Sequence, residues 1–150
     1  FVGSTPVAKH VYKKSATYGK RVQAQGGAKN HVIVTETADL AFAAEKTVSS
    51  AFACGRERCL ANAIAVGEES VYEEFVELVV TEANAQTVWY GLDDGVDIGA
   101  LITPEHEQSV RNFIETGVQE GAELLLDGRD VSVDGYEAGN FLGPCIFRDV

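Results

Sequence analysis

The order of secondary structure is plainest in residues 30–67, which read NHVIVTETADLAFAAEKTVSSAFACGRERCLANAIAVG. The opening residues are rich in β-branched side chains and predict a strand, and the closing six, NAIAVG, predict a second one. Between them, apolar residues recur at helical spacing after Thr37 or Asp39, either of which can begin a helix. We expect this helix to end at Cys54 and Gly55. A strand, a helix and another strand in this order favour a parallel pair with a crossover helix.

The same alternation extends over the rest of the chain. Ser4 and Thr5 are candidate N-caps before Pro6, and a helix is expected from there to Tyr18. The further elements that we expect are strands at 21–25 and 122–128, a helix over 70–85 capped by Ser70, and a helix over 105–121 closed by Gly121. The predicted fold class is therefore α/β, with a mainly parallel sheet and flanking helices.

Composition and charge narrow the class of protein. The chain is 45% hydrophobic, and no apolar run approaches the roughly 18 residues of a membrane-spanning helix. Its net charge is -11, and residues 47–150 carry five Arg, no Lys and twenty acids, which argues against a nucleic acid partner. Three cysteines, an odd number, favour reduced thiols and a cytoplasmic location. The acidic surface fits a high-salt cytoplasm and an ordinary acidic protein almost equally well.

Two stretches carry candidate chemistry. The first is GSTPV, in which Gly3, Ser4 and Thr5 precede a helix, so their N–H and O–H groups can bind a phosphate or simply cap the helix. The second is RERCLA, in which the Cys59 thiol has arginines nearby that favour the nucleophilic thiolate. The histidines have no ligand spacing to a cysteine or to a pair of carboxylates, so we expect no metal site.

The roles of the residues around Cys59 are open at this point. Cysteine is often a small buried side chain, and this interpretation fits Cys54 and Cys145 better than Cys59. Arg58 is suited to a substrate carboxylate, and it is equally suited to an ion pair with Glu57 or to a contact with a nearby helix.

Taken in order, FVGSTPVA, GGAKNHVIV, DLAFAA, RERCLA, YEEFVE and DDGVDIGALITPEH resemble the NAD-dependent aldehyde dehydrogenase superfamily along essentially the whole chain. GAKNH and the arginine directly before the cysteine are most similar to its coenzyme A-acylating branch, the methylmalonate-semialdehyde dehydrogenases. The resemblance implies that residues 1–26 end a dinucleotide-binding domain and that 27–150 begin a catalytic domain. Family members are much longer, so we expect a fragment whose intact parent is a homodimer or homotetramer.

The resemblance also implies roles for single residues. Gly3, Ser4 and Thr5 match the family's NAD contact. Cys59 matches the nucleophile that attacks an aldehyde, gives up hydride to NAD and becomes a thioester. Gln25 lies 34 residues before Cys59, where hydrolytic members carry the glutamate that activates water.

The turn that contains Gln25, Gly27 and Asn30 is thus expected near the catalytic site. An amide accepts no proton at neutral pH, so attack of water on the thioester should be slow. A thiol such as coenzyme A is acidic enough to release the acyl group instead. Under this interpretation the substrate is a small semialdehyde with a carboxylate, which Arg58 would bind.

One departure from the family pattern keeps two other hypotheses open. Arg56 stands where the family has a glycine, three residues before the nucleophile, and Gly55 lies one position earlier. If the turn needs that glycine, the thiol is displaced. The chain would then be a catalytically silent module that serves as an interaction domain. A third hypothesis is a hydrolytic aldehyde dehydrogenase that uses another base.

Overall fold

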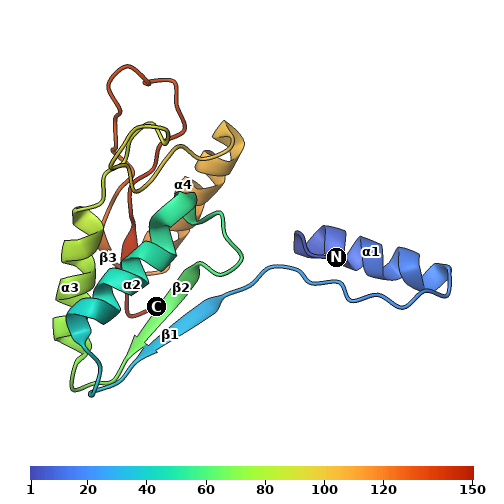
Figure 1. Ribbon diagram of the computed structural model, residues 1–150, viewed down its shortest axis with the longest axis horizontal. Helices are drawn as coiled ribbons and strands as arrows, with labels where there is room; N and C mark the ends of the chain where they lie inside the picture. The colour runs from blue at the N-terminus through green and yellow to red at the C-terminus, as the bar shows by residue number, and fades with distance from the viewer. The chain divides into compact units, whose positions relative to one another are not determined.

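The computed structural model describes residues 1–150 and divides them into two compact units, Phe1–Asn30 and His31–Val150. In chain order the elements are α1 (Thr5–Thr17), β1 (Asn30–Val34), α2 (Leu40–Phe52), the 3-10 helix η1 (Ala53–Arg56), β2 (Asn62–Gly67), α3 (Tyr72–Asn84), α4 (Pro104–Gln119), β3 (Glu123–Leu126) and β4 (Ile146–Arg148) (Figure 1). We describe each unit by itself.

The first unit consists of α1 and the two segments that flank it. Ser4 is the N-cap residue and Pro6 lies in the first turn, as expected from the sequence. The strand expected at 21–25 is wrong, because only Gln25 pairs, in a single parallel bridge with Val2. The segment beside it is too short to extend the ladder, since α1 begins three residues after Val2.

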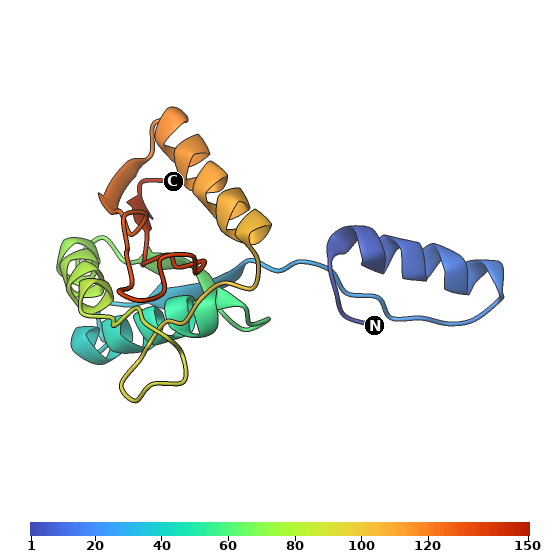
Figure 2. The same ribbon diagram turned by 90° about the horizontal axis from the view of Figure 1, so that it is seen from above.

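The second unit begins with the predicted strand, helix and strand. β1 and β2 are neighbours in a two-stranded sheet, and Figure 1 shows them running in the same direction with α2 as the crossover. Asp39 caps α2, because its carboxylate accepts a hydrogen bond from the Phe42 N–H at 3.1 Å. Val34, Ala44 and Phe75, from β1, α2 and α3, form the buried core. Figure 2 shows α2 and α4 on opposite sides of this strand pair.

The limits of α3 and α4 follow local hydrogen bonds. Ser70 does not cap α3, contrary to the expectation, because the Val71 N–H donates to the Glu68 carbonyl and places Ser70 in the preceding turn. α4 begins where the Thr103 hydroxyl accepts a hydrogen bond from the His106 N–H, at 3.1 Å. It is followed by Gly121, whose φ of 94° permits the left-handed turn expected there.

A second, separate sheet is formed by β3 and β4. These strands run antiparallel, with Glu123 opposite Arg148 and Leu124 opposite Phe147. The sequence predicted β3 but not β4, which is only three residues long. The chain therefore contains one parallel and one antiparallel strand pair.

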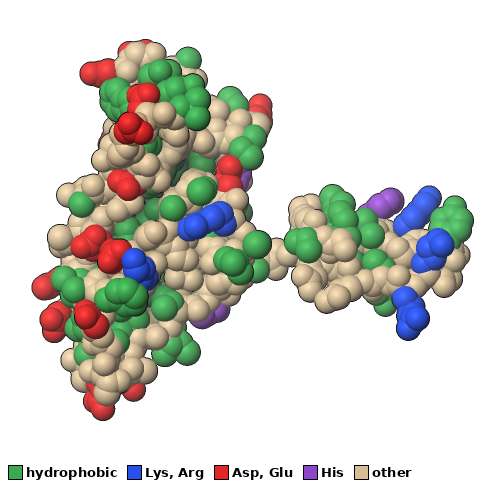
Figure 3. Space-filling view, in the orientation of Figure 1, with side chains coloured by type: hydrophobic (Ala, Val, Ile, Leu, Met, Phe, Trp, Pro, Cys, Tyr) green, Lys and Arg blue, Asp and Glu red, His purple; other side chains and the backbone are tan.

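Charge is distributed very differently over the two units. Residues 1–30 contain six Lys or Arg and no acid, whereas the remaining six Lys or Arg accompany all 23 Asp and Glu in residues 31–150. Figure 3 shows blue side chains without red ones on the first unit, and red ones spread over the second. No helix in the structure combines the length and the apolar character needed to cross a membrane.

Candidate active site

The loop that carries Cys59 has an unusual backbone. We call residues 53–61 the cysteine loop; it joins the end of α2 to β2. Three consecutive residues, Cys54, Gly55 and Arg56, have positive φ values of 57°, 58° and 61°. Left-handed backbone costs a non-glycine residue about 1–2 kcal/mol. Interactions between the loop and its surroundings must therefore hold this conformation in place.

Two arginines hold the ends of the cysteine loop. Arg58 Nη2 donates to the carbonyls of Ser49 and Ser50, at 2.9 and 3.0 Å. These carbonyls lie in the last turn of α2, which contains no basic residue of its own, so the cation complements the negative end of the helix dipole. Arg56 Nε donates to the carbonyl of Asn62, the first residue of β2, at 3.3 Å.

Glu57 connects the cysteine loop to the start of α4. Its carboxylate accepts a hydrogen bond from the Ile102 N–H at 3.4 Å, and the same oxygen lies 3.7 Å from His106 Nε2. The interaction of Arg58 in this structure is thus the contact with α2, rather than an ion pair with Glu57. Sequence analysis missed the anchor at Ile102, because 45 residues separate the two partners.

The three cysteines lie in different environments. Cys59 and Cys54 are both exposed, whereas Cys145 is partly buried. The burial expected for Cys54 is wrong, because this residue lies in η1, beyond the packed part of α2. The Cys145 sulfur accepts a hydrogen bond from the Gly128 N–H at 3.2 Å, and burial raises the pKa of its thiol. The structural interpretation therefore holds for Cys145.

In the first unit, the turn and the start of α1 are joined by hydrogen bonds. The Gly3 N–H donates to the Gln25 carbonyl at 3.1 Å, and the Gln25 N–H donates to the Phe1 carbonyl at 3.0 Å. The Gly27 N–H donates to the Thr5 hydroxyl oxygen at 3.1 Å. The structure thus brings together four of the residues singled out from the sequence. Among these four residues, Gln25 has an exposed side chain.

Gly26 explains how the turn approaches the helix so closely. A Cβ atom at Gly26 would lie 2.7 Å from the Thr5 hydroxyl oxygen and 3.1 Å from the Thr5 Cα atom, so a side chain would separate the two segments. Ser4, at the N-cap, makes no side-chain capping hydrogen bond. Its exposed hydroxyl is not committed to the helix, as the phosphate interpretation requires. Asn30, the last residue of this unit, begins β1 and is partly buried.

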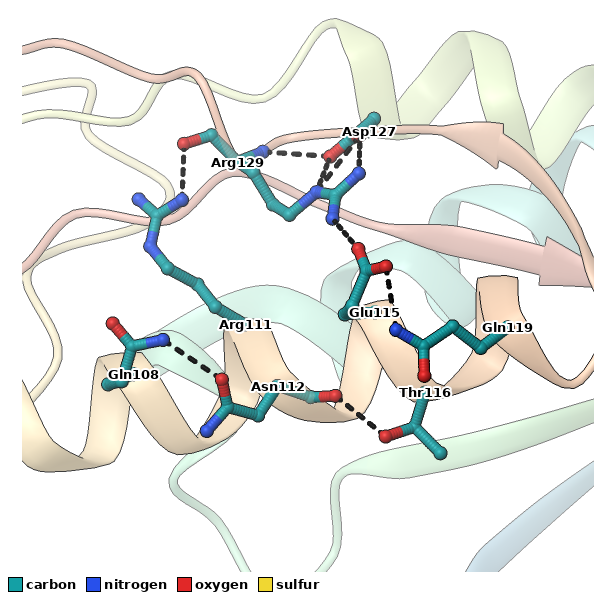
Figure 4. Close-up of polar contacts among 8 residues, drawn as sticks. All are labelled: Gln108, Arg111, Asn112, Glu115, Thr116, Gln119, Asp127 and Arg129. Carbon is teal, nitrogen blue, oxygen red and sulfur yellow. Dashed lines mark hydrogen bonds and ion pairs between the residues drawn. The ribbon is translucent and has the colours of Figure 1, made fainter.

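A second polar cluster lies between α4 and the segment that follows β3 (Figure 4). We call it the α4–β3 corner; it comprises Glu107, Arg111, Glu115, Asp127 and Arg129. Arg129 Nε donates to the two Asp127 oxygens at 2.8 and 3.0 Å, and its Nη1 lies 3.3 Å from Glu115. Arg111 donates to the Arg129 carbonyl and to Glu107, both at 2.8 Å. Arg129 thereby holds the pKa of the Asp127 carboxyl below its usual value.

Groups of three or more His, Cys, Asp or Glu side chains that could hold a metal ion are absent from residues 1–150.

Comparison with known proteins defines the class. The aldehyde dehydrogenase family matches residues 1–150, so the chain belongs to this family. A malonate-semialdehyde dehydrogenase of Bacillus mycoides is 45% identical over 150 residues, and the match covers all of this chain but 31% of that protein. The chain thus spans about a third of the length of the curated relatives that it matches.

Solved structures agree with this assignment and confirm the α/β fold class. A methylmalonate-semialdehyde dehydrogenase of Oceanimonas doudoroffii superposes with a TM-score of 0.92 at 36% identity, covering 98% of this chain and 30% of that one. An aldehyde dehydrogenase of Mycobacterium tuberculosis, solved with NAD+, gives a TM-score of 0.92 at 30% identity, covering 100% and 31%. The comparisons thus agree on the aldehyde dehydrogenase family, and the structure of the Mycobacterium tuberculosis relative contains NAD+.

Proposed function

We propose that the parent of this chain oxidises a small carboxylated semialdehyde, of the malonate or methylmalonate type, to an acyl-coenzyme A. The observation that carries the proposal is the exposed Cys59 thiol on a loop fixed by two arginines. Relatives named malonate-semialdehyde dehydrogenase, 43–47% identical among the first three, support this substrate class. In this account residues 1–26 belong to the dinucleotide-binding domain and 27–150 to the catalytic domain.

Cys59 is the proposed nucleophile. Its sulfur adds to the aldehyde carbon, and the resulting thiohemiacetal loses a hydride and the hydroxyl proton to become a thioester. When bound, NAD supplies the hydride acceptor. The thiol of coenzyme A then displaces the Cys59 sulfur, which leaves as the thiolate, and a methylmalonate-type substrate also loses carbon dioxide.

Residues 3–5 are the proposed contact for the phosphates of NAD. The start of α1 presents the uncommitted Ser4 hydroxyl and the positive end of the helix dipole. Its unit contains no acidic side chain, and Lys9 and Lys13 line a cavity of about 260 Å³ beside Thr5. These groups favour an anion at this end of the unit.

Gln25 accounts for the proposed preference for coenzyme A over water. It occupies the position of the water-activating glutamate in hydrolytic relatives, and an amide side chain cannot act as a general base at neutral pH. Gly27 and Asn30, in the same turn, are proposed to lie near the catalytic site.

Arg58 is the proposed partner of the substrate carboxylate. Both of its hydrogen bonds to α2 use Nη2, which leaves the N–H groups of Nε and Nη1 for contacts with a carboxylate. The two interactions that the sequence left as alternatives are thus compatible in one side chain.

The test is NADH formation by the intact parent with malonate semialdehyde, with and without coenzyme A. We expect turnover to require coenzyme A, to be lost in Cys59→Ser, and to become partly independent of coenzyme A in Gln25→Glu. Equal turnover without coenzyme A would identify a hydrolytic enzyme, and no turnover would favour the catalytically silent module. Light scattering of the same sample tests the proposed dimer or tetramer, and cell fractionation tests the cytoplasmic location.

A further inference from the structure

The cysteine loop carries a second thiol that the proposed reaction does not use. Cys54 and Cys59 are separated by four residues, CGRERC, and both are exposed. The third cysteine, Cys145, is partly buried and hydrogen-bonded to Gly128. Exposure makes thiols accessible to oxidants, so the two susceptible thiols of the chain lie in the same loop.

The backbone of the cysteine loop is compact between the two thiols. The Glu57 N–H donates to the Cys54 carbonyl at 3.0 Å, and the Arg58 N–H donates to the Arg56 carbonyl at 2.8 Å. Each hydrogen bond closes a tight turn, so the chain reverses direction within the five residues that follow Cys54.

The arginine contacts add a second constraint. Arg58 reaches back to Ser49 and Ser50, one turn before Cys54, and Cys59 is the next residue along the chain. The contact therefore draws the Cys59 segment toward the helix end that carries Cys54. The positive φ of Cys54 also strains the backbone, and a local rearrangement would relieve this strain. The strain therefore favours movement at Cys54.

From this geometry we propose that Cys54 and Cys59 form a reversible disulfide when the protein meets a peroxide, with Cys54 as the resolving cysteine. The Cys59 thiolate attacks hydrogen peroxide, gives a sulfenic acid and releases hydroxide, which takes up the thiol proton to become water. The Cys54 thiol then attacks the sulfenic sulfur, the S–S bond forms, and a second water leaves. A dithiol reductant restores both thiols by exchange.

The consequence for activity rests on the proposed function. If Cys59 is the nucleophile, the disulfide blocks catalysis but protects the sulfur from irreversible oxidation to the sulfinic acid. The disulfide itself does not depend on that role, so the two ideas are tested by separate measurements.

Mass spectrometry of the full chain tests the disulfide directly. Trypsin cleaves after Lys46, Arg56, Arg58 and Arg111, so it separates Cys54, in peptide 47–56, from Cys59, in peptide 59–111. After brief hydrogen peroxide treatment, blocking of the remaining thiols and digestion, we expect these two peptides to be joined. Dithiothreitol should separate them. Cys145→Ser is the matched control and should give the same joined peptides.

The Cys54→Ser variant provides the second readout. We expect its Cys59 to accumulate as sulfinic acid that dithiothreitol does not reduce. The chain without the substitution should regain nearly all of its Cys59 thiol. The proposal is overturned if no joined peptide forms, if Cys59 oxidises irreversibly to the same extent with and without Cys54, or if the joined peptides come only from disulfide-linked dimers. NADH formation plays no part in these results, so a failure of the proposed function is recognised separately.

Discussion

The cysteine loop and the α4–β3 corner both contain two arginines, and they use them in opposite ways. In the corner, Arg129 contacts two carboxylates, so its own charge is cancelled. In the loop, Arg56 and Arg58 donate to backbone carbonyls, so their charge is not cancelled by a carboxylate. A cation without a paired anion is available to an incoming carboxylate.

The two regions also differ in backbone. Gly128, between the corner residues Asp127 and Arg129, is in close contact with Gly143, whose N–H donates to the Gly128 carbonyl at 2.9 Å. The cysteine loop instead contains three left-handed residues in sequence. The comparison suggests that the corner stabilises the unit, whereas the loop gives up some stability to present a reactive side chain.

The largest effect should come from adding a methyl group to the corner. The Cβ atom of Gly128→Ala would lie 2.3 Å from the Gly143 carbonyl carbon, a backbone atom that cannot rotate away. We expect a loss of about 3 kcal/mol in the free energy of unfolding. Gly55→Ala, in the cysteine loop, meets only the Leu101 side chain at 3.1 Å and should cost about 1 kcal/mol.

Urea unfolding measures both variants. Gly95→Ala is the matched control for backbone conformation, because Gly95 has a φ of 78° and open space around its Cβ position. If Gly128→Ala were as stable as Gly55→Ala, close packing at the corner would not contribute more stability than the cysteine loop does.

A smaller effect, on both stability and substrate binding, is expected at Arg58. Arg58→Lys keeps the charge but loses the guanidinium, which can bond to α2 through Nη2 and to a carboxylate through its other N–H groups. KM of the parent for malonate semialdehyde should therefore rise about tenfold. Propanal, which has no carboxylate, is the control substrate and should keep its KM. Arg58→Ala should in addition lower the free energy of unfolding by about 1–2 kcal/mol, since two hydrogen bonds to α2 are lost.

Equal losses for malonate semialdehyde and propanal in Arg58→Lys would show that Arg58 only positions the cysteine loop. The two regions would then differ in stability but not in a role in substrate binding. The hydrogen bonds of Arg58 to α2 would remain.

The smallest expected effect is the pH dependence of the stability that the Asp127–Arg129 pair of the corner contributes. Arg129 lowers the pKa of Asp127 in the folded state, so the interaction contributes stability above the unfolded pKa of about 4 and loses it as the pH falls through the folded value. The Asp127 side chain is 38% exposed, and solvent screening should keep the contribution below about 1 kcal/mol. Asp127→Asn should therefore lose less stability between pH 7 and pH 3 than the unsubstituted chain does. An identical dependence of stability on pH in the two chains would argue against the interaction.

Most elements of the fold could be predicted from the sequence, because their signals are local. Asp39, Pro6 and Gly121 mark helix ends as expected, and NAIAVG is β2. β4 was missed because a three-residue strand depends on its partner, β3, rather than on its own pattern. Ser70 was misjudged because a turn competes with the cap for the same residues.

The candidate site was predictable in its residue types but not in its contacts. Cys59 and its arginines were predicted from their proximity in the sequence. The turn at Gln25 was predicted from its resemblance to a known family. The hydrogen bonds of Arg58 to Ser49 and of Glu57 to Ile102 depend on how the loop folds back. Spacing along the chain does not report such contacts.

The most direct test of the account is the alkylation rate of each thiol in the folded, reduced chain. Iodoacetamide at neutral pH, followed by trypsin, reports the three cysteines separately, in peptides 47–56, 59–111 and 130–148. We predict that Cys59 reacts fastest, Cys54 more slowly, and the partly buried Cys145 slowest. Because Cys54 and Cys59 are both exposed, equal rates for these two would contradict the claim that the cysteine loop activates Cys59 as a nucleophile.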